Sequence, residues 1–211
     1  MWNATEKGRP MATQESTGRK YLLWVDGVGV YLLCLGQRVS FGGPAFDENA
    51  ADVSLLADLS RRHATIVRCG EGYLLEAHAN VHVAGRAVSQ QVHLNDGYEI
   101  RLGDDVEMKF QLPTALSTSA RIEFQSDHRP TLSVDGLVLM DDTCLLGASP
   151  ENHVVCPECP GSVLLIRKGT ELWCKSRMEV FVGRERVTQE RRIESGDIVT
   201  GPELRFRLEE V

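Results

Sequence analysis

The sequence has little of what marks several large classes of protein. It has no basic excess, because 23 Lys and Arg face 30 Asp and Glu and the formal net charge is −7. Proteins that bind duplex nucleic acid usually carry a basic surface, so we expect no nucleic-acid partner. The longest apolar run, 28–35, is far shorter than the roughly 20 residues of a membrane-spanning helix. We therefore expect no membrane partner either.

Cysteines and aromatic residues are also scarce. Six cysteines among 211 residues are too few to suggest a disulfide scaffold. The first 20 residues contain no apolar core of a secretory signal, so we expect a reduced, cytoplasmic protein. Aromatics make up only 6% of the chain, but hydrophobic residues reach 42%, which excludes wholesale disorder.

Short apolar runs fill the chain after a polar start. Residues 1–20 hold four basic and two acidic residues without periodicity, which predicts a flexible polar tail. From Tyr21 onward, runs such as YLLWV, HATIVR and VEMKF are bounded by Gly, Asp or Asn. Many short strands with tight turns predict an all-β sandwich fold.

The pattern of short runs occurs twice in the same order. The run LWVDGVGVYLL recurs as LSVDGLVLM, and LNDGYEIRLG recurs as IESGDIVTG, at offsets of roughly 100–109 residues. Two homologous domains follow from this, at 21–112 and 130–211. The stretch 113–129 between them is expected to be a linker or an extra strand, because Ile122 and Phe124 alternate with polar residues.

The run DLSRRHATI carries the clearest candidate for binding chemistry. Ser60 offers a hydroxyl group, and Arg61 and Arg62 offer planar cationic donors beside it. A few donors that converge at one loop tip can hold the acceptor oxygens of a phosphate. An ordinary polar loop between two strands is the alternative interpretation.

Three motifs in order give this part of the chain a family resemblance. Gly42, the run 60–63 (SRRH) and the stretch LNDGYEIRLG together resemble a forkhead-associated (FHA) domain over nearly all of 21–112. The resemblance implies an eleven-stranded β-sandwich whose loops at one end bind phosphothreonine peptides. It also implies that Ser60 and Arg61 contact the phosphate, that His63 braces the loop and that Gly42 is the turn glycine.

Two positions depart from the family pattern. Gly43 stands where the family has an arginine that binds phosphate, and Arg62 or Arg38 is a candidate substitute. Asn80 is a candidate for the asparagine that holds the peptide backbone, although no glycine follows it and it is equally typical of a simple turn. The expected phosphopeptide contacts are Ser60, Arg61, Arg62 and Asn80, with Gly42 and His63 supporting the loops.

The second repeat departs further. Its run LLGASPENHVV is similar to the family's first binding loop but has Ala148 in place of the arginine. The run 160–163 (PGSV) occupies the position of the S-x-x-H motif. We expect a degenerate FHA-like domain that has lost its phosphate site.

The sequence predicts a non-enzymatic module that binds a phosphorylated protein or peptide in Ser/Thr kinase signalling, without a cofactor. One alternative is a scaffold whose domains bind unphosphorylated partners, because the phosphate-site arginine is missing. Another is a metal-dependent enzyme built around a zinc site at Cys156 and Cys159, with His153, Cys144 and Cys174 as further candidate ligands. A second C-x-x-C is lacking, however, and Cys34, Cys69 and Cys174 lie in apolar runs typical of small core residues. A phosphothreonine of the tail (Thr5, Thr13 or Thr17) that binds at Ser60 in cis is a further hypothesis.

Overall fold

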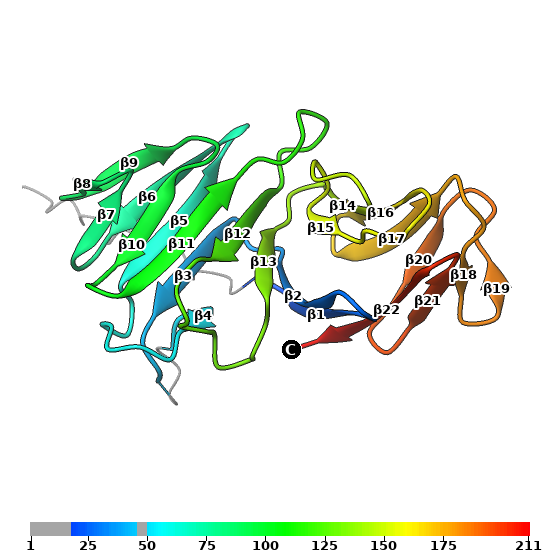
Figure 1. Ribbon diagram of the computed structural model, residues 1–211, viewed down its shortest axis with the longest axis horizontal. Helices are drawn as coiled ribbons and strands as arrows, with labels where there is room; N and C mark the ends of the chain where they lie inside the picture. Colours follow the sequence, from blue (N-terminus) through cyan, green and yellow to red (C-terminus); the bar gives the residue numbers. More distant parts are fainter. Residues whose placement is uncertain (1–17, 46–49) are drawn as a thin grey trace, which may run out of the picture.

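The computed structural model describes residues 18–45 and 50–211, and it is built from β-strands alone (Figure 1). This confirms the predicted all-β class. No helix of the described residues is long and apolar enough to cross a membrane. The predicted flexible tail and its threonines lie outside the described residues, apart from the last three residues of 1–20.

The described residues form twenty-two strands, which follow one another in two sets of eleven. The first set is β1 (Lys20–Val25), β2 (Gly29–Cys34), β3 (Arg38–Gly42), β4 (Val53–Ser54), β5 (Ala64–Cys69), β6 (Gly72–Ala77), β7 (Val81–Val83), β8 (Arg86–Ala87), β9 (Gln91–Leu94), β10 (Glu99–Leu102) and β11 (Val106–Gln111). The second set is β12 (Ala120–Phe124), β13 (Gly136–Leu139), β14 (Thr143–Gly147), β15 (Val154–Val155), β16 (Ser162–Lys168), β17 (Glu171–Ser176), β18 (Phe181–Val182), β19 (Glu185–Arg186), β20 (Arg191–Ile193), β21 (Ile198–Gly201) and β22 (Leu204–Glu210).

The two sets are arranged in the same way. A five-stranded sheet of order β4-β3-β5-β6-β9 defines the first lobe, and one of order β15-β14-β16-β17-β20 defines the second lobe (Figure 1). Both lobes share a twelve-stranded sheet of order β19-β18-β21-β22-β1-β2-β13-β12-β11-β10-β7-β8. Each strand of the second set therefore holds the place of the strand eleven before it.

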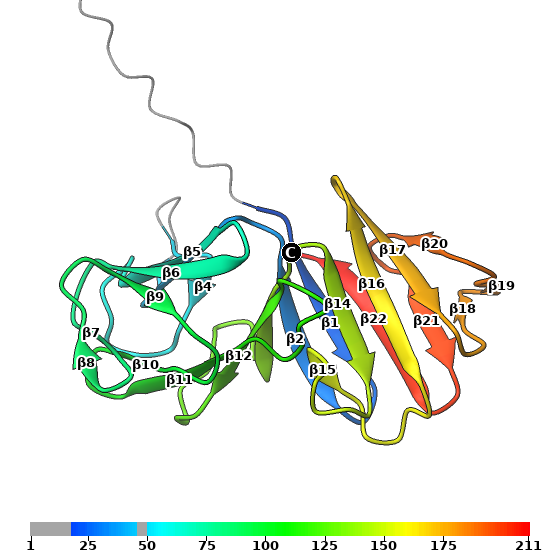
Figure 2. The same cartoon turned by 90° about the horizontal axis from the view of Figure 1, so that it is seen from above.

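The opening hairpins of the two sets are exchanged between the lobes. Strand β1 pairs with β22, the last strand of the second set, whereas β12 pairs with β11, the last strand of the first set. The two hairpins meet where β2 and β13 run parallel in the middle of the shared sheet (Figure 2). The segments 21–34 and 113–139 thus complete the sheet of the opposite lobe, and the stretch 113–129 includes strand β12.

Both faces of the central strands are buried because a different lobe covers each face. Along β13, Leu137 and Leu139 belong to the core of the first lobe, whereas Val138 and Met140 belong to the core of the second. Successive side chains of a strand point to opposite faces, so the two cores lie on opposite sides of the shared sheet. In β1 the same alternation places Leu23 in the core of the second lobe and Leu22 in that of the first, whereas Trp24 is exposed.

Two arginines hold the connections where the chain passes from the shared sheet into each lobe. The Arg68 guanidinium is buried; it forms an ion pair with Asp141 and donates to the Gly36 carbonyl at 3.1 Å. The equivalent Arg167 donates to the Leu35 carbonyl at 2.6 Å. Each arginine thus ties its own lobe to a connection of the shared hairpins.

The cysteines are free thiols, and five of the six are buried. Burial raises the pKa of Cys34 and of Cys174 to about 12 and that of Cys156 to about 11, so these thiols stay protonated near neutral pH. Cys69 is exposed at the end of β5, so the prediction that it is a small core residue is wrong. The strand pattern ends there, and the chain turns at Gly70. No group of three or more metal-ligating side chains that could hold an ion occurs among the described residues.

Candidate functional site

The predicted site lies at one end of the first lobe, where three loops converge on the end of β3. Gly42 is buried against the loop that precedes β5, and a Cβ atom on it would overlap the carbonyl oxygen of Arg61. The Gly43 N–H donates to the Ser60 carbonyl at 3.0 Å. Only glycine permits this close approach of two backbones, so Gly42 fixes the position of the Ser60 loop.

His63 connects the three loops through both nitrogens of its ring. It is 4% exposed; its Nδ1 accepts from the Ser60 N–H at 3.3 Å, and its Nε2 lies 2.7 Å from the Asn80 carbonyl oxygen. A neutral ring with the proton on Nε2 satisfies both bonds, because a carbonyl only accepts. The Asn80 carbonyl also accepts from the Gly103 N–H at 2.9 Å. His63 therefore holds the Ser60, Asn80 and Gly103 loops at fixed positions.

The predicted contact residues are all at the surface of these loops. Ser60, Arg61 and Arg62 are exposed on the loop before β5, and Asn80 is exposed on the loop before β7. The hydrogen bonds of His63 bring the backbones of Ser60 and Asn80 to the same ring. The four side chains thus border one loop end, where guanidinium and hydroxyl groups are donor types that suit an anionic ligand.

The packing around Gly43 leaves no room for the arginine of the family pattern. The sequence alone did not indicate this restriction. Gly43 is buried, and a Cβ atom on it would overlap the carbonyl oxygen of Leu59. A side chain of any size at this position would displace the loop that carries Ser60. The packing of the Ser60 loop against β3 therefore requires glycine at position 43 and is incompatible with an arginine there.

Arg38, considered as a substitute for that arginine, lies at the other end of β3. Its guanidinium donates to both carboxylate oxygens of Glu76. Four residues of extended strand separate Arg38 from Gly42, which corresponds to roughly 13 Å. Arg38 therefore bridges β3 to β6 across β5, and Arg61 and Arg62 are the guanidinium groups at the loop end.

The equivalent end of the second lobe has none of these groups. Val163 pairs with Leu146 as Ala64 pairs with Phe41, so Ser162 takes the place of His63. This corrects by one residue the sequence alignment that placed Val163 there; a short loop gives no pattern that fixes such a register. Cys159 then takes the place of Ser60, and it is buried.

His153 supports the second lobe in another way. It is fully buried; its Nδ1 accepts from the Leu145 N–H at 3.1 Å, and its Nε2 lies 3.1 Å from the Ser119 carbonyl oxygen. Burial lowers the pKa of His153, and the Ser119 carbonyl partly opposes this effect. In the first lobe Asp52 holds the corresponding place and accepts from the Ser40 N–H. His153 thus joins β14 to the residue that precedes β12, and its role is structural.

Comparisons with known proteins give FHA domains among solved structures. No family model and no curated protein matches the chain. One match, Mycobacterium tuberculosis EmbR in complex with a low-affinity phosphopeptide, has 29% identity and a TM-score of 0.33 over 44% of this chain. The match spans 24% of the EmbR chain. A second, the FHA domain of CT664 from Chlamydia trachomatis, has 27% identity and a TM-score of 0.30, and covers 40% of this chain and 89% of that one.

A third match extends over most of the molecule. The N-terminal FHA domain of EssC, a component of the bacterial type VII secretion apparatus, covers 90% of this chain and 94% of its own, with 10% identity and a TM-score of 0.27. Each half of the present chain contributes eleven strands, the number that the sequence resemblance implies. The fold is FHA-like.

Proposed function

We propose that the loop end of the first lobe binds a phosphothreonine segment of a partner protein in Ser/Thr kinase signalling. The observation that carries this proposal is the His63 ring, which fixes the Ser60 and Asn80 loops relative to each other. A ligand that needs both loops at once then meets a preorganised surface, so little entropy is lost on binding. On this proposal the chain is an interaction module and not an enzyme.

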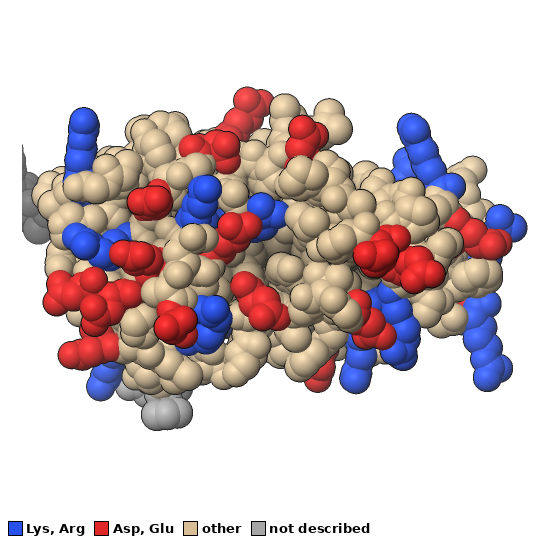
Figure 3. All heavy atoms as spheres, viewed as in Figure 1, with Lys and Arg blue, Asp and Glu red and all other residues tan. Residues whose placement is uncertain are grey.

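Each exposed side chain has a distinct part in binding. The Ser60 hydroxyl would donate to a phosphate oxygen, and the Arg61 and Arg62 guanidinium groups would neutralise its charge. Asn80 would hold the peptide backbone through its amide. On the face of the first lobe that Figure 3 shows, acidic and basic side chains alternate, and the formal net charge of the chain is −7, so the attraction to a phosphate has to be local.

The glycine at position 43 sets the strength of this site. A charge-assisted hydrogen bond to an ionised group contributes roughly 1.5–3 kcal/mol, so its loss corresponds to a roughly ten- to hundredfold weaker affinity. We therefore expect weak binding that relies on Arg61 and Arg62.

The packing of Gly43 favours one second candidate function. The Leu59 carbonyl oxygen lies 2.3 Å from where the Cβ atom of a side chain at position 43 would stand, so the loop has no room for the arginine of the family pattern. A scaffold that binds unphosphorylated partners through the same loops would use this surface without a phosphate.

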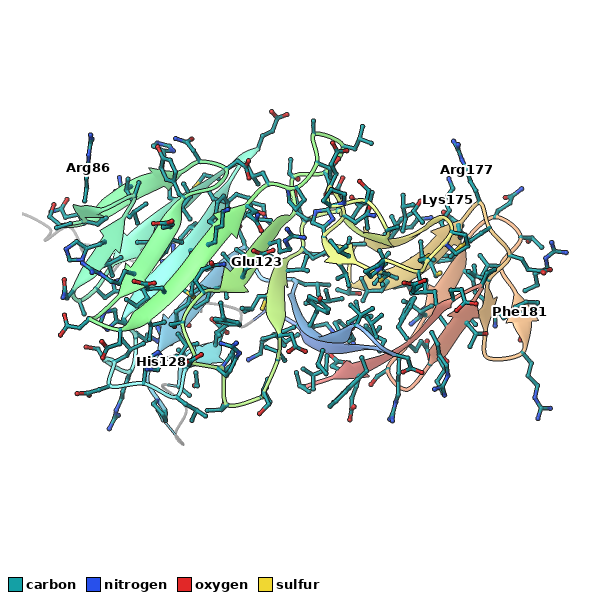
Figure 4. The ribbon with its side chains drawn as sticks, viewed as in Figure 1. Arg86, Glu123, His128, Lys175, Arg177 and Phe181 are labelled. Atoms are coloured by element: carbon teal, nitrogen blue, oxygen red, sulfur yellow. The ribbon has the colours of Figure 1, made fainter. Side chains whose placement is uncertain are left out.

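Capture from a degenerate peptide library fixed at phosphothreonine, with unphosphorylated threonine as the control library, separates the two candidates. We expect phosphate-dependent capture by the full chain that is lost in Ser60→Ala and Arg61→Ala. The matched variants Ser89→Ala and Arg86→Ala change exposed residues outside these loops, and they should keep full capture (Figure 4 labels Arg86). Equal capture from both libraries would contradict the phosphothreonine proposal and favour the scaffold.

A further inference from the structure

A cavity lies between the β12–β13 part of the shared sheet and the second lobe. It has a volume of about 300 Å³, and Val155 of β15 forms one wall. The opposite wall is the β12–β13 part of the shared sheet, where Glu123, labelled in Figure 4, lies on β12. The remaining lining residues are Tyr31, Arg121, Ile122, Phe124, Gln125, Asp135, Gly136 and His153.

Strand β15 has one edge that no described strand pairs with. It is the terminal strand of its sheet, and it pairs only with β14. The Cys156 N–H points inward and donates to the Gly147 carbonyl at 2.9 Å. Because neighbouring residues of a strand direct their backbone groups to opposite sides, the N–H and C=O of Val155 point outward, towards the cavity.

The first lobe shows what covers the equivalent edge. There β4 is the terminal strand, and a segment centred on Pro130 pairs with it in antiparallel fashion opposite Leu55. The Thr131 N–H donates to the Ser54 carbonyl at 2.8 Å. Pro130 is buried by this contact. Ser54 is the equivalent of Val155, so the carbonyl that accepts a bond in the first lobe has no backbone donor in the second among the described residues.

The difference arises from the lengths of two equivalent loops. The covering segment belongs to the loop 125–135 between β12 and β13, which has eleven residues. Its equivalent between β1 and β2, 26–28, has three residues and cannot reach β15. The second lobe therefore retains the edge and the cavity but lacks the segment that fills them.

The N-terminal stretch of the chain contains a segment that matches the covering one. The first lobe uses the sequence RPTLS at 129–133, and the stretch 9–13 reads RPMAT. In both, Arg-Pro is followed by two further residues and then by a residue with a hydroxyl side chain, Ser133 in one and Thr13 in the other. Arg121 and Glu123 of the cavity wall pair with each other at 2.8 Å, so the Asp135 carboxylate is the group that complements the single charge of Arg9.

The chain is long enough to place this segment in the cavity. Gly18 lies against Gly36. Gly36 is five residues after Tyr31, which lines the cavity, so the distance along the chain from Gly36 to the cavity is at most roughly 17 Å. The eight residues from Gly18 back to Pro10 span up to roughly 28 Å.

We propose that the segment 9–13 of the same chain binds the edge of β15, with Pro10 in the cavity. By analogy with Thr131, the Met11 N–H would donate to the Val155 carbonyl. Pro157 stands at the place of Leu56, whose N–H donates to the Arg129 carbonyl at 3.0 Å in the first lobe. The pairing on β15 therefore has one bond fewer than its template, since proline has no N–H. Docking of the segment 9–13 on β15 would therefore be weaker than the pairing in the first lobe, and reversible.

Hydrogen exchange of the full chain tests the pairing, with variants outside the described fold so that its stability is not at issue. Met11→Pro removes the N–H that the pairing needs, and Glu6→Pro introduces the same residue elsewhere in the stretch. We expect the Thr13 amide, whose equivalent Ser133 N–H donates to the Pro130 carbonyl at 2.8 Å in the first lobe, to exchange about tenfold faster in Met11→Pro than in the natural chain and in Glu6→Pro. Equal exchange in all three proteins would overturn the proposal.

A photoreactive benzoylphenylalanine in place of Glu123 identifies the occupant. Isotope-labelled and unlabelled full chains are mixed before irradiation, and the cross-linked peptides are analysed by mass spectrometry. Cross-links to 9–13 within chains of one label support the proposal. Cross-links between labels would assign the site to a second copy, and an absence of cross-links to 9–13 would assign it to another partner; either result overturns binding in cis.

Discussion

Single residues decide whether the loop end of the first lobe can act as a phosphate site. Gly42 and His63 could be identified from the sequence, because a glycine and a histidine at that spacing accompany Ser60 in the FHA pattern. The obstruction at Gly43 could not, since it depends on the Leu59 carbonyl, whose position is set by the folded loop. The roles of Ser60, Arg61, Arg62 and Asn80 stay predictions.

Restoring the arginine of the family pattern is expected to harm the protein. Gly43→Arg forces the loop away from β3, so the free energy of unfolding should fall by about 1–3 kcal/mol. The equivalent Ala148→Arg is exposed and should change it by less than about 0.5 kcal/mol. Urea unfolding of both variants measures this. A Gly43→Arg variant as stable as Ala148→Arg would mean that the loop yields easily.

His153 makes the stability of the second lobe depend on pH. Burial lowers the pKa of His153 below its ordinary 6.5, so below that value the unfolded chain takes up a proton that the folded chain refuses. The free energy of unfolding should fall as pH drops through 6.5, with a slope of up to about 1.4 kcal/mol per pH unit from this group. Urea unfolding between pH 7.5 and 5.5 should show a smaller slope in His153→Gln than in His78→Gln, whose exposed ring is the control. Identical slopes would contradict this assignment.

At the scale of the elements, the sequence predicted strands and their repetition but not which strands pair. An apolar run such as YLLWV indicates a buried strand, and the period of the repeat indicates two similar units. Neither contains information on whether β1 pairs with β11 or with β22, because the two last strands present equivalent edges. The exchange of hairpins depends on the direction of the chain in the connections 35–37 and 140–142. Three residues are too few to show a sequence pattern that would predict this direction.

Arg68 is expected to stabilise this crossing. Its guanidinium is buried and forms an ion pair with Asp141, so Asp141→Ala removes the counter-ion of a buried charge while its bonds to the Gly36 and Met140 carbonyls remain, and it should cost about 1–3 kcal/mol in the free energy of unfolding. The neighbouring Asp142→Ala removes an exposed carboxylate with only long hydrogen bonds of 3.4 Å, and it should cost less than about 0.5 kcal/mol. Chemical denaturation of the two variants compares these costs, and equal values would show that the ion pair does not stabilise the crossing.

At the scale of the whole molecule, the lobes depend on each other for their cores. The core of the second lobe includes Leu23 and Leu33 of the first hairpin, and the core of the first includes Ile122 and Leu137 of the second. Fragments 18–112 and 113–211 therefore each lack strands of their own core. We expect neither fragment to unfold cooperatively alone and an equimolar mixture to do so, as judged by circular dichroism during thermal unfolding. A fragment that melts cooperatively by itself would contradict the exchange.

The meeting of β1 with β22 has a mechanical consequence. The Val211 N–H donates to the Lys20 carbonyl, and Arg19 forms an ion pair with Glu210, so the first and last described strands begin and end side by side. A force that pulls these two ends apart loads the antiparallel pair from one end and opens its hydrogen bonds one after another, like a zipper. Tension along the chain would therefore separate β1 from β22, and with it the β1–β2 hairpin from the second lobe, before it strained the rest of the shared sheet.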